Sequence, residues 1–499
     1  MRECGILLPI ASLPSKYGIG AFSREAYEFV DQLKAAGQSY WQILPLGPTG
    51  YGDSPYQAFS AFAGNPYFID PEQLVADGLL TEEECSEADF GGGEGYIEYE
   101  KVYRERFPVL KKAFLRWREQ MEREGQSLGN VFGEELLEET REYCFYAAVK
   151  RHFQEKSWDK WDEDIRLRKK EAVDRYREIL GEETDFYQFQ QLMFARQWRK
   201  LKGYANEQGI RIIGDIPIYV AFDSADSWRH PELFQFDRDN QPKAVAGCPP
   251  DAFSETGQLW GNPLYDWPYH KKTGFAWWLE RMRYSFELYD VVRVDHFRGF
   301  DEYYAIPAGD DTAVNGTWKK GPGLALFKKM RQTFGELNII AEDLGYLTPS
   351  VRKLLSDTGF PGMKVLQFAF STGERSDYLP YLYGHNCVVY TGTHDNDTTR
   401  GWYETMDEAE RAFTEEYMDN LSTPAEEISW DFIRLAVSSV ADLAVIPLQD
   451  YLCKGKEGRI NTPSTLGDNW IWRLKEGEFS QEIIERCRKL NWIYGRCQA

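Results

Sequence analysis

The sequence lacks the signatures of a membrane or secreted protein. No stretch of its 499 residues approaches the roughly 20 uninterrupted apolar residues that a membrane helix needs. The apolar run near the N-terminus is short and broken by Pro9, so we interpret it as a strand rather than a signal peptide. We therefore expect a cytoplasmic protein with no membrane partner.

Cysteine is present, but its spacing excludes two common uses. The eight cysteines are scattered and form no CxxC pair, which argues against a zinc site. Without a signal peptide, the same scatter argues against a disulfide framework. We expect reduced thiols at Cys4, Cys85, Cys144, Cys248, Cys387, Cys453, Cys487 and Cys497.

Basic residues are too few for binding to nucleic acid. The 58 Lys and Arg against 80 Asp and Glu give a formal net charge of −22, whereas phosphate backbones are bound by clustered cations. The charge mainly favours solubility. There is also no glycine-rich phosphate loop, so nucleotide binding has no support.

The composition is that of a globular protein rich in aromatic rings. Hydrophobic residues make up 42% and charged residues 28%, enough for a sizeable core. Aromatic residues make up 15%, with 16 Trp, 30 Tyr and 30 Phe. Aromatic faces stack on the apolar faces of sugar rings, so this excess is compatible with carbohydrate binding, although most rings are expected to fill the core.

Eight short segments rich in β-branched residues predict strands. Most are continuous apolar runs that end in polar residues, as is typical of parallel strands buried on both faces. They span residues 4–10, 40–46, 210–220, 290–297, 337–344, 363–370, 387–395 and 443–450. Helical spacing over residues 26–33, and a helix from an N-cap at Thr348 to a stop at Gly359, lie between strands. This alternation predicts an α/β fold, a (β/α)8 barrel.

The barrel is expected to form one domain over residues 1–499 with two large insertions at the C-terminal face of its strands. The first, about 50–205, is highly charged and mainly helical in pattern, and its interleaved acidic residues favour a solvated helical subdomain over a basic helix. The GGGEG run at 91–95 predicts a flexible connection within it. The second insertion, about 221–289, is predicted to be a loop subdomain, and no C-terminal β-sandwich is expected.

Ionisable residues end four of the predicted strands. Active sites of such barrels lie at the C-terminal ends of the strands. Each residue alone would more often cap a helix or support the fold, but carboxylates gathered on one rim raise one another's pKa, which favours a catalytic site. A metal site is the main alternative, disfavoured because an arginine rather than further histidines accompanies the carboxylates. The residues are Asp215, Arg293, Asp295, His296, Glu342, Asp343, His394, Asp395 and Asp397.

Two carboxylates flanking an acetal linkage are suited to glycoside chemistry. One attacks the anomeric carbon while the other, kept protonated, donates to the leaving oxygen. An arginine beside the first keeps it ionised, and burial with nearby negative charge raises the pKa of the second. A third carboxylate can stabilise the oxocarbenium-like transition state.

Several long motifs give the sequence a family resemblance. They are GYGDSPYQ, GDIPIYV, FSETGQLWGNPLY, VRVDHFRGF, AEDLG and YTGTHDNDT. With them, the chain resembles the 4-α-glucanotransferases (amylomaltases, or disproportionating enzymes) of glycoside hydrolase family 77, relatives of the α-amylases. The resemblance runs from SLPSKYGIGAF to NTPSTLGDNWIWRL and is weakest between about residues 85 and 185.

The resemblance implies roles for the matching residues. Asp295 matches the nucleophile, Glu342 the general acid/base and Asp395 the transition-state stabiliser. Arg293 and His394 match residues that bind the sugar beside the cleaved bond. The family uses no cofactor and no obligatory metal, and its donors and acceptors are maltooligosaccharides and other α-1,4-glucans.

Further matches lie around this centre. Asp215 is grouped with the substrate-binding residues, in a structural or supporting position on the third strand. Trp260 lies in a loop that folds over the acceptor side, and Tyr51 in a segment associated with an outlying glucan site. Asn461 and Pro463 resemble a further contact on the rim. The absence of an appended starch-binding domain favours maltooligosaccharides or soluble glucans, and we expect a monomer or homodimer.

Two alternative functions remain open at this stage. An α-glucan hydrolase would use the same residues and differ only in whether water or a sugar hydroxyl resolves the glycosyl-enzyme. The loop around Trp260 and the family resemblance favour transfer. A catalytically inactive glucan-binding protein is disfavoured because all three carboxylates are present.

Overall fold

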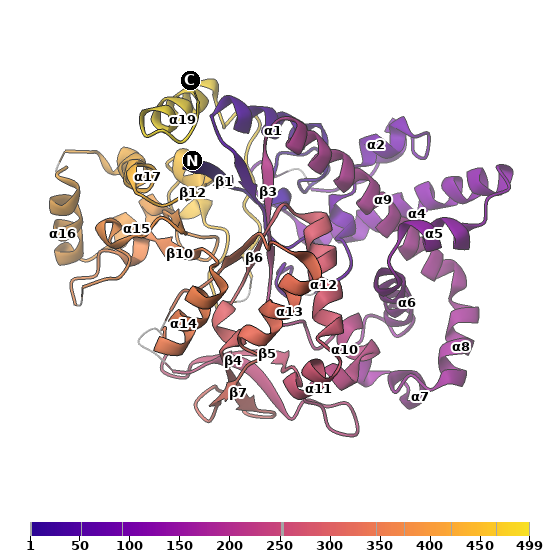
Figure 1. The fold of residues 1–499 in the computed structure, drawn as a ribbon. Coiled ribbons are helices and arrows are strands. Elements are labelled where there is room, and N and C mark those ends of the chain that lie inside the picture. The colour runs from indigo at the N-terminus through magenta and orange to yellow at the C-terminus, as the bar shows by residue number, and fades with distance from the viewer. Residues whose placement is uncertain are drawn as a thin grey trace.

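Eight parallel strands close into a barrel at the centre of the molecule (Figure 1). The computed structural model describes residues 2–50, 52–91, 93–250, 254–345, 347–373, 375–420, 422–465 and 467–498. The barrel order is β1-β12-β11-β10-β9-β6-β3-β2. Its strands are β1 (Glu3–Leu7), β2 (Tyr40–Gln42), β3 (Arg211–Ile216), β6 (Val291–Val294), β9 (Ile339–Ala341), β10 (Gly362–Val365), β11 (Cys387–Tyr390) and β12 (Leu443–Pro447). Each overlaps one predicted segment, so the (β/α)8 prediction is confirmed.

The strands are buried on both faces, which explains their continuous apolar sequences. Residues pointing inward, such as Ile213, Val388 and Val445, pack in one cluster that fills the barrel. Residues pointing outward join the larger core beneath the helices. The barrel interior is therefore solid, and a substrate has access only to its rim.

Helices surround the barrel, and their ends follow the local sequence signals. In α14 (Pro349–Thr358), the Thr348 side chain accepts a hydrogen bond from the Val351 N–H, and Gly359 ends the helix at φ 69°. The predicted helix over residues 26–33 is part of α1 (Arg24–Ala35). The other helices around the barrel are α12 (Ala276–Leu288), α13 (Leu324–Phe334), α15 (Thr399–Thr405), α16 (Glu408–Met418), α17 (Ile428–Ser438), α18 (Leu448–Tyr451) and α19 (Gln481–Ile493).

A helical subdomain lies between β2 and β3, on the right in Figure 1. It contains α2 (Pro71–Ala76), α3 (Glu82–Ser86), α4 (Tyr99–Arg123), α5 (Leu128–Glu135), α6 (Glu138–His152), α7 (Glu163–Arg166), α8 (Lys170–Ile179) and α9 (Gly181–Glu207). Gln191 of α9 bonds both the N–H and the carbonyl of Gly64, at 2.7 and 2.8 Å. Helix α9 thereby fixes the segment that follows β2. Part of the GGGEG run, Gly92, lies outside the described residues.

A four-stranded antiparallel sheet lies below the barrel in Figure 1, near the short helices α10 (Ala225–Arg229) and α11 (Trp267–Lys272). Its order is β5 (Gln258–Pro263), β4 (Ala244–Cys248), β7 (Glu302–Pro307) and β8 (Thr317–Lys320). It is not among the elements predicted from the sequence. Its strands are short, and Gly247 and Gly261 weaken their strand pattern. The sheet joins the loop predicted at 221–289 to a segment between β6 and β9.

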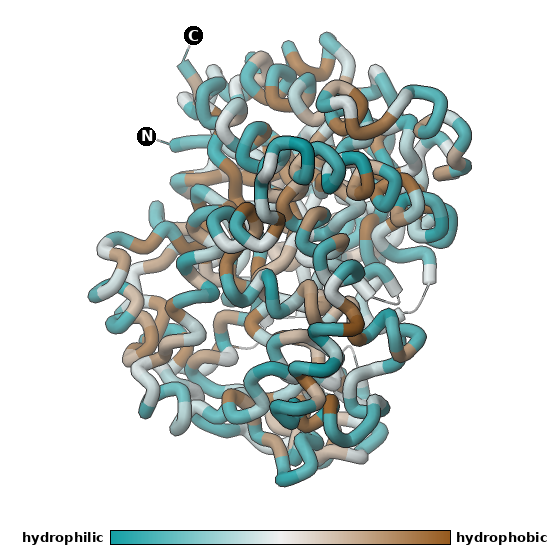
Figure 2. Tube along the Cα trace, turned by 90° about the vertical axis from the view of Figure 1, so that its right-hand side faces the viewer, coloured by the Kyte–Doolittle hydropathy of each residue, from teal (hydrophilic) through white to brown (hydrophobic). Residues whose placement is uncertain are grey.

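Hydrophilic residues dominate the outer turns of the helices in Figure 2, and hydrophobic segments run mainly through the interior. No helix in the described ranges combines the length and the apolar character needed to cross a bilayer.

Candidate active site

A cleft of about 1570 Å³ lies over the carboxyl ends of the barrel strands. Its lining includes Asp295, Glu342 and Asp395, which follow β6, β9 and β11 respectively. Parallel strands end on the same rim, so three carboxylates distant in sequence meet in one cleft. Arg293 and Trp260 also line it.

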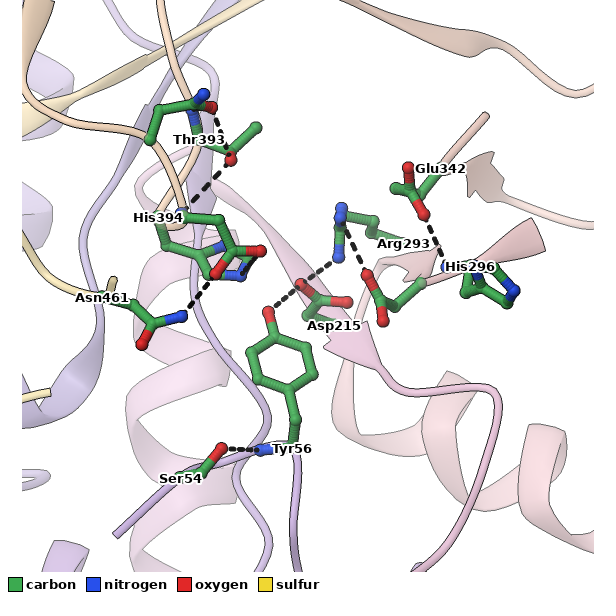
Figure 3. A network of polar contacts seen from close by, with 12 residues as sticks. Ser54, Tyr56, Asp215, Arg293, His296, Glu342, Thr393, His394 and Asn461 are labelled. Atoms are coloured by element: carbon green, nitrogen blue, oxygen red, sulfur yellow. Dashed lines mark hydrogen bonds and ion pairs between the residues drawn. The ribbon is translucent and has the colours of Figure 1, made fainter. Parts of the chain in front are cut away.

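Arg293 connects two of the acidic residues. Its Nη1 lies 2.6 Å from Asp215 Oδ2, and its Nη2 lies 3.1 Å from Asp295 Oδ1 (Figure 3). Asp215 stands directly opposite Arg293 in the β3–β6 register and is completely buried. Asp215 also accepts a hydrogen bond of 2.8 Å from the Tyr56 hydroxyl. Asp215 therefore contacts Arg293 and Tyr56, and both of these residues line the cleft.

Asp295 is deep in the cleft but can be reached from it, since 30% of its side chain is exposed. Burial among protein atoms raises its pKa to about 6, and the charges of Asp215 and Asp395 act in the same direction. The positive charge of Arg293 opposes them and favours the carboxylate. Asp295 is thus the more readily ionised member of a pair with Glu342.

Glu342 is held by two backbone N–H groups. One oxygen accepts from His296 at 2.7 Å and the other from Leu344 at 2.8 Å. His296 has a left-handed backbone, φ 53°, which is uncommon for a residue with a side chain. Burial raises the pKa of Glu342 to about 7, and the charge of Asp295 adds to this effect. Glu342 is therefore fixed in position and holds its proton more strongly than Asp295.

The surroundings of Asp395 favour its charged form, whereas those of Glu342 favour the protonated form. Asp395 Oδ2 lies 3.3 Å from His394 Nε2, and Asp395 Oδ1 accepts from Asn461 Nδ2 at 2.6 Å. Burial alone would raise the pKa of Asp395, but His394 and Asn461 outweigh it and hold this pKa below the usual range. Conversely, burial lowers the pKa of His394 but Asp395 outweighs it, so that pKa is raised.

Tyr56 joins the two halves of the network and was not singled out from the sequence. Its ring stacks on His394, with centroids 5.1 Å apart and an interplanar angle of 18°. Its hydroxyl bonds Asp215, so one side chain contacts both the β3 and the β11 residues. The available signal was its place in the GYGDSPYQ motif.

The loop after β11 is anchored from beneath by Asp450, another residue missed in the sequence. Asp450 accepts hydrogen bonds from the hydroxyls of Thr391 and Thr399, at 2.5 and 2.7 Å, and from the Thr399 N–H at 2.8 Å. Asp450 ends the eighth predicted strand, a position that could have marked it. These bonds bracket and hold the segment that carries His394 and Asp395.

Trp260 lines the cleft next to His296. Its ring meets His296 edge to face, with centroids 4.8 Å apart. Burial, with a smaller effect of Arg298, lowers the pKa of His296 to about 4, so this imidazole is neutral at physiological pH. Trp260 therefore lies next to the residue whose N–H holds Glu342.

The remaining predicted residues divide between cleft and core. Asp397 and Pro463 line the cleft. Asp343 is buried, and its side chain accepts the Met363 N–H at 2.6 Å, which gives it a role in the fold. Tyr51 lies outside the described residues. Within the described ranges, no group of three or more His, Cys, Asp or Glu side chains is arranged to hold a metal ion.

A parallel eight-stranded barrel with carboxylates gathered at its strand ends defines a class, the barrel enzymes that act on glycosidic bonds. Comparison with known proteins narrows this class. The model of the 4-alpha-glucanotransferase family matches residues 8–479. The chain belongs to this family, and the resemblance noted from its motifs is confirmed.

The similarity to individual relatives extends over nearly the full length of this chain. A 4-alpha-glucanotransferase of Clostridium butyricum is 48% identical over 98% of this chain and 100% of its own. One of Thermus thermophilus is 47% identical over 98% of each chain. The structure of an amylomaltase from Streptococcus agalactiae in complex with acarbose superposes with a TM-score of 0.95, at 41% identity and complete coverage of both chains. Two of these relatives are named 4-alpha-glucanotransferases and the third an amylomaltase, which gives no support to the α-glucan hydrolase alternative.

Proposed function

We propose that this protein transfers α-1,4-glucan segments between maltooligosaccharides or soluble glucans through a covalent intermediate on Asp295. The observation that carries the proposal is the contrast between Asp295 and Glu342. Both carboxyls lie in one cleft, but Asp295 contacts Arg293, whereas Glu342 has the higher pKa. A pair of carboxyls that share one proton suits a nucleophile and an acid.

In the first step, an Asp295 oxygen attacks the anomeric carbon and the glycosidic C–O bond breaks. Glu342 donates its proton to the leaving oxygen, which departs as the 4-hydroxyl of the shortened glucan. Arg293 keeps Asp295 ionised before the attack. Asp395 is an anion at every relevant pH, since His394 and Asn461 lower its pKa. It can therefore stabilise the positive charge that develops on the sugar ring.

In the second step, an acceptor glucan takes the place of the leaving group. Glu342, now a carboxylate, removes the proton from the acceptor 4-hydroxyl as its oxygen attacks the anomeric carbon. The Asp295–sugar bond breaks, and both carboxyls return to their starting states. Two inversions at the anomeric carbon retain the α configuration.

Substrate contacts follow from the same arrangement. We assign Arg293 and the His394–Asp395 pair to the sugar at the cleaved bond, with Asn461 on the rim beside them. Trp260 is assigned to the acceptor side, where its ring would stack on the incoming glucan and exclude water. Tyr51 is assigned to an outlying glucan contact on the strength of the family resemblance.

Maltotriose distinguishes transfer from hydrolysis. Water is present at about 55 M, but a positioned hydroxyl reaches effective molarities far above this, so a bound acceptor wins. We expect glucose together with a ladder of longer maltooligosaccharides, and little increase in total reducing ends. Chromatography of the products with a reducing-end assay measures both. Shorter products with a matching rise in reducing ends would indicate a hydrolase, and unchanged maltotriose with intact binding would indicate a binding protein.

The same assay tests Trp260. Trp260→Ala should weaken transfer more than hydrolysis, because the loss of the ring loosens the acceptor and admits water. We expect the ratio of transfer to hydrolysis to fall roughly two- to tenfold, in line with the 0.5–1.5 kcal/mol of an aromatic contact. An equal loss of transfer and hydrolysis would contradict the assignment of Trp260 to the acceptor site.

A further inference from the structure

The antiparallel sheet extends from the cleft to a second exposed aromatic surface. Leu259 of β5 lines the cleft next to Trp260. It pairs with Gly247 of β4, which pairs with Tyr304 of β7, which pairs with Trp318 of β8. Directly paired residues share one face of a sheet. A single row therefore leads from the cleft at Leu259 to Trp318.

Both ends of this row are exposed and apolar. Leu259 is 41% exposed and Trp318 is 36% exposed. The loop over the middle of the face adds Val314, which is 54% exposed. We call Leu259, Val314 and Trp318 the distal shelf.

Trp318 and the loop that carries Val314 are fixed by contacts with neighbouring residues. The guanidinium of Arg298, itself buried, lies 3.8 Å from the centre of the Trp318 ring. Tyr304 meets Trp318 at 5.1 Å, and its hydroxyl donates to the Ala313 carbonyl at 3.0 Å. The Ala313 N–H in turn donates to the Thr256 carbonyl at 3.0 Å, in the segment leading to β5. The loop under Val314 is thus tied to the strand that carries Trp260.

We propose that the distal shelf binds the far end of long α-glucans whose reacting end occupies the cleft. This inference rests on the proposed function and extends it to the choice of chain length. Three strand spacings separate β5 from β8, about 14 Å. A short oligosaccharide in the cleft does not reach Trp318, whereas a longer glucan can cross from Leu259 to the Trp318 ring.

A glucan fits this surface better than a second copy of the chain. Leu259, at one end of the shelf, lines the cleft, so a chain bound in the cleft lies beside the shelf at this residue. A stable protein interface takes roughly 20–30 residues on each side, far more than these three apolar side chains. An uncharged polymer of sugar rings needs only isolated flat contacts.

The test compares maltotriose with soluble amylose for Trp318→Ala. We expect kcat/KM for amylose to fall roughly two- to tenfold, the range of one aromatic contact, while kcat/KM for maltotriose stays unchanged. Trp318→Tyr should recover most of the loss because it keeps a ring. Val314→Asp, which places a charge on the shelf, should act in the same direction if Trp318→Ala is poorly folded. Trp492→Ala, at a tryptophan 56% exposed on α19, is the matched control and should change neither value.

Several results would overturn the proposal. One is an unchanged kcat/KM for amylose in Trp318→Ala and Val314→Asp; another is an equal loss on both substrates that Trp318→Tyr does not recover. A wild-type dimer in sedimentation that dissociates in Trp318→Ala would identify the shelf as an interface between copies. Failure of the wild type to disproportionate maltotriose would refute the proposed function itself, independently of Trp318.

Discussion

Replacing Asp295 with asparagine is expected to lower turnover on maltooligosaccharides by on the order of 10⁴-fold or more. The amide keeps the shape of the side chain and can still accept from Arg293 through its oxygen, but it cannot attack the anomeric carbon. Glucan binding should therefore persist. Initial rates of maltotriose disproportionation, together with titration calorimetry on the same variant, measure both effects.

A matched control for this variant follows β9, the barrel strand next to β6. Asp343→Asn makes the same chemical change in a buried aspartate whose side chain accepts the Met363 N–H. The amide oxygen can still accept that N–H, so the free energy of unfolding should change by less than about 1.5 kcal/mol and the turnover of the folded protein by less than tenfold. If Asp295→Asn retained more than about a tenth of the wild-type rate, a barrier change below 1.4 kcal/mol, Asp295 would not be the nucleophile.

Replacing Glu342 with glutamine should produce a loss that depends on the leaving group. The leaving group of a maltooligosaccharide departs as an alkoxide unless its oxygen is protonated. The turnover rate on these substrates should therefore fall by roughly 10³-fold. A maltosyl fluoride needs no proton for departure, and its first step should be largely spared. Burst kinetics with the fluoride and steady-state kinetics with maltotriose give the comparison. Equal losses on both substrates would argue against a role for Glu342 in proton transfer.

The pH profile provides a second measure of the same residue. Below a pH of about 6, Asp295 takes up a proton and the nucleophile is lost. Above about 7, Glu342 loses its proton and the acid is lost. The wild-type kcat/KM should therefore be bell-shaped with its maximum between these values, the two limbs belonging to the pair as a whole. In Glu342→Gln, the first step with the fluoride should lose the alkaline limb and keep the acidic one.

The barrel could be predicted from sequence because its strands are buried on both faces. Continuous apolar runs such as those around Val292 and Val389 have few other interpretations when helices alternate with them. The antiparallel sheet could not be predicted in the same way. Its strands are short and contain Gly247 and Gly261, and β8 is exposed along its whole length, so it shows no hydrophobic pattern.

The site was predicted in its ionisable residues but not in its connections. The ends of parallel strands must meet, so Asp295 and Glu342 could be placed together before their contacts were known. Tyr56 could not be placed, because it reaches Asp215 and His394 through an insertion whose path depends on tertiary packing. The electrostatic contrast between Asp395 and Glu342 also depends on hydrogen-bond partners, above all Asn461, that lie far away in sequence.

The most direct test of the account is to trap the covalent intermediate. When the Glu342→Gln variant is incubated with maltosyl fluoride, it should form the glycosyl-enzyme. The maltosyl group should then be transferred only slowly, because no general base activates an acceptor. Proteolysis and mass spectrometry should then find one maltosyl group on the peptide that contains residues 291–300, attached at Asp295. An adduct on another residue, or fluoride release at the wild-type rate with no adduct, would contradict the proposed mechanism.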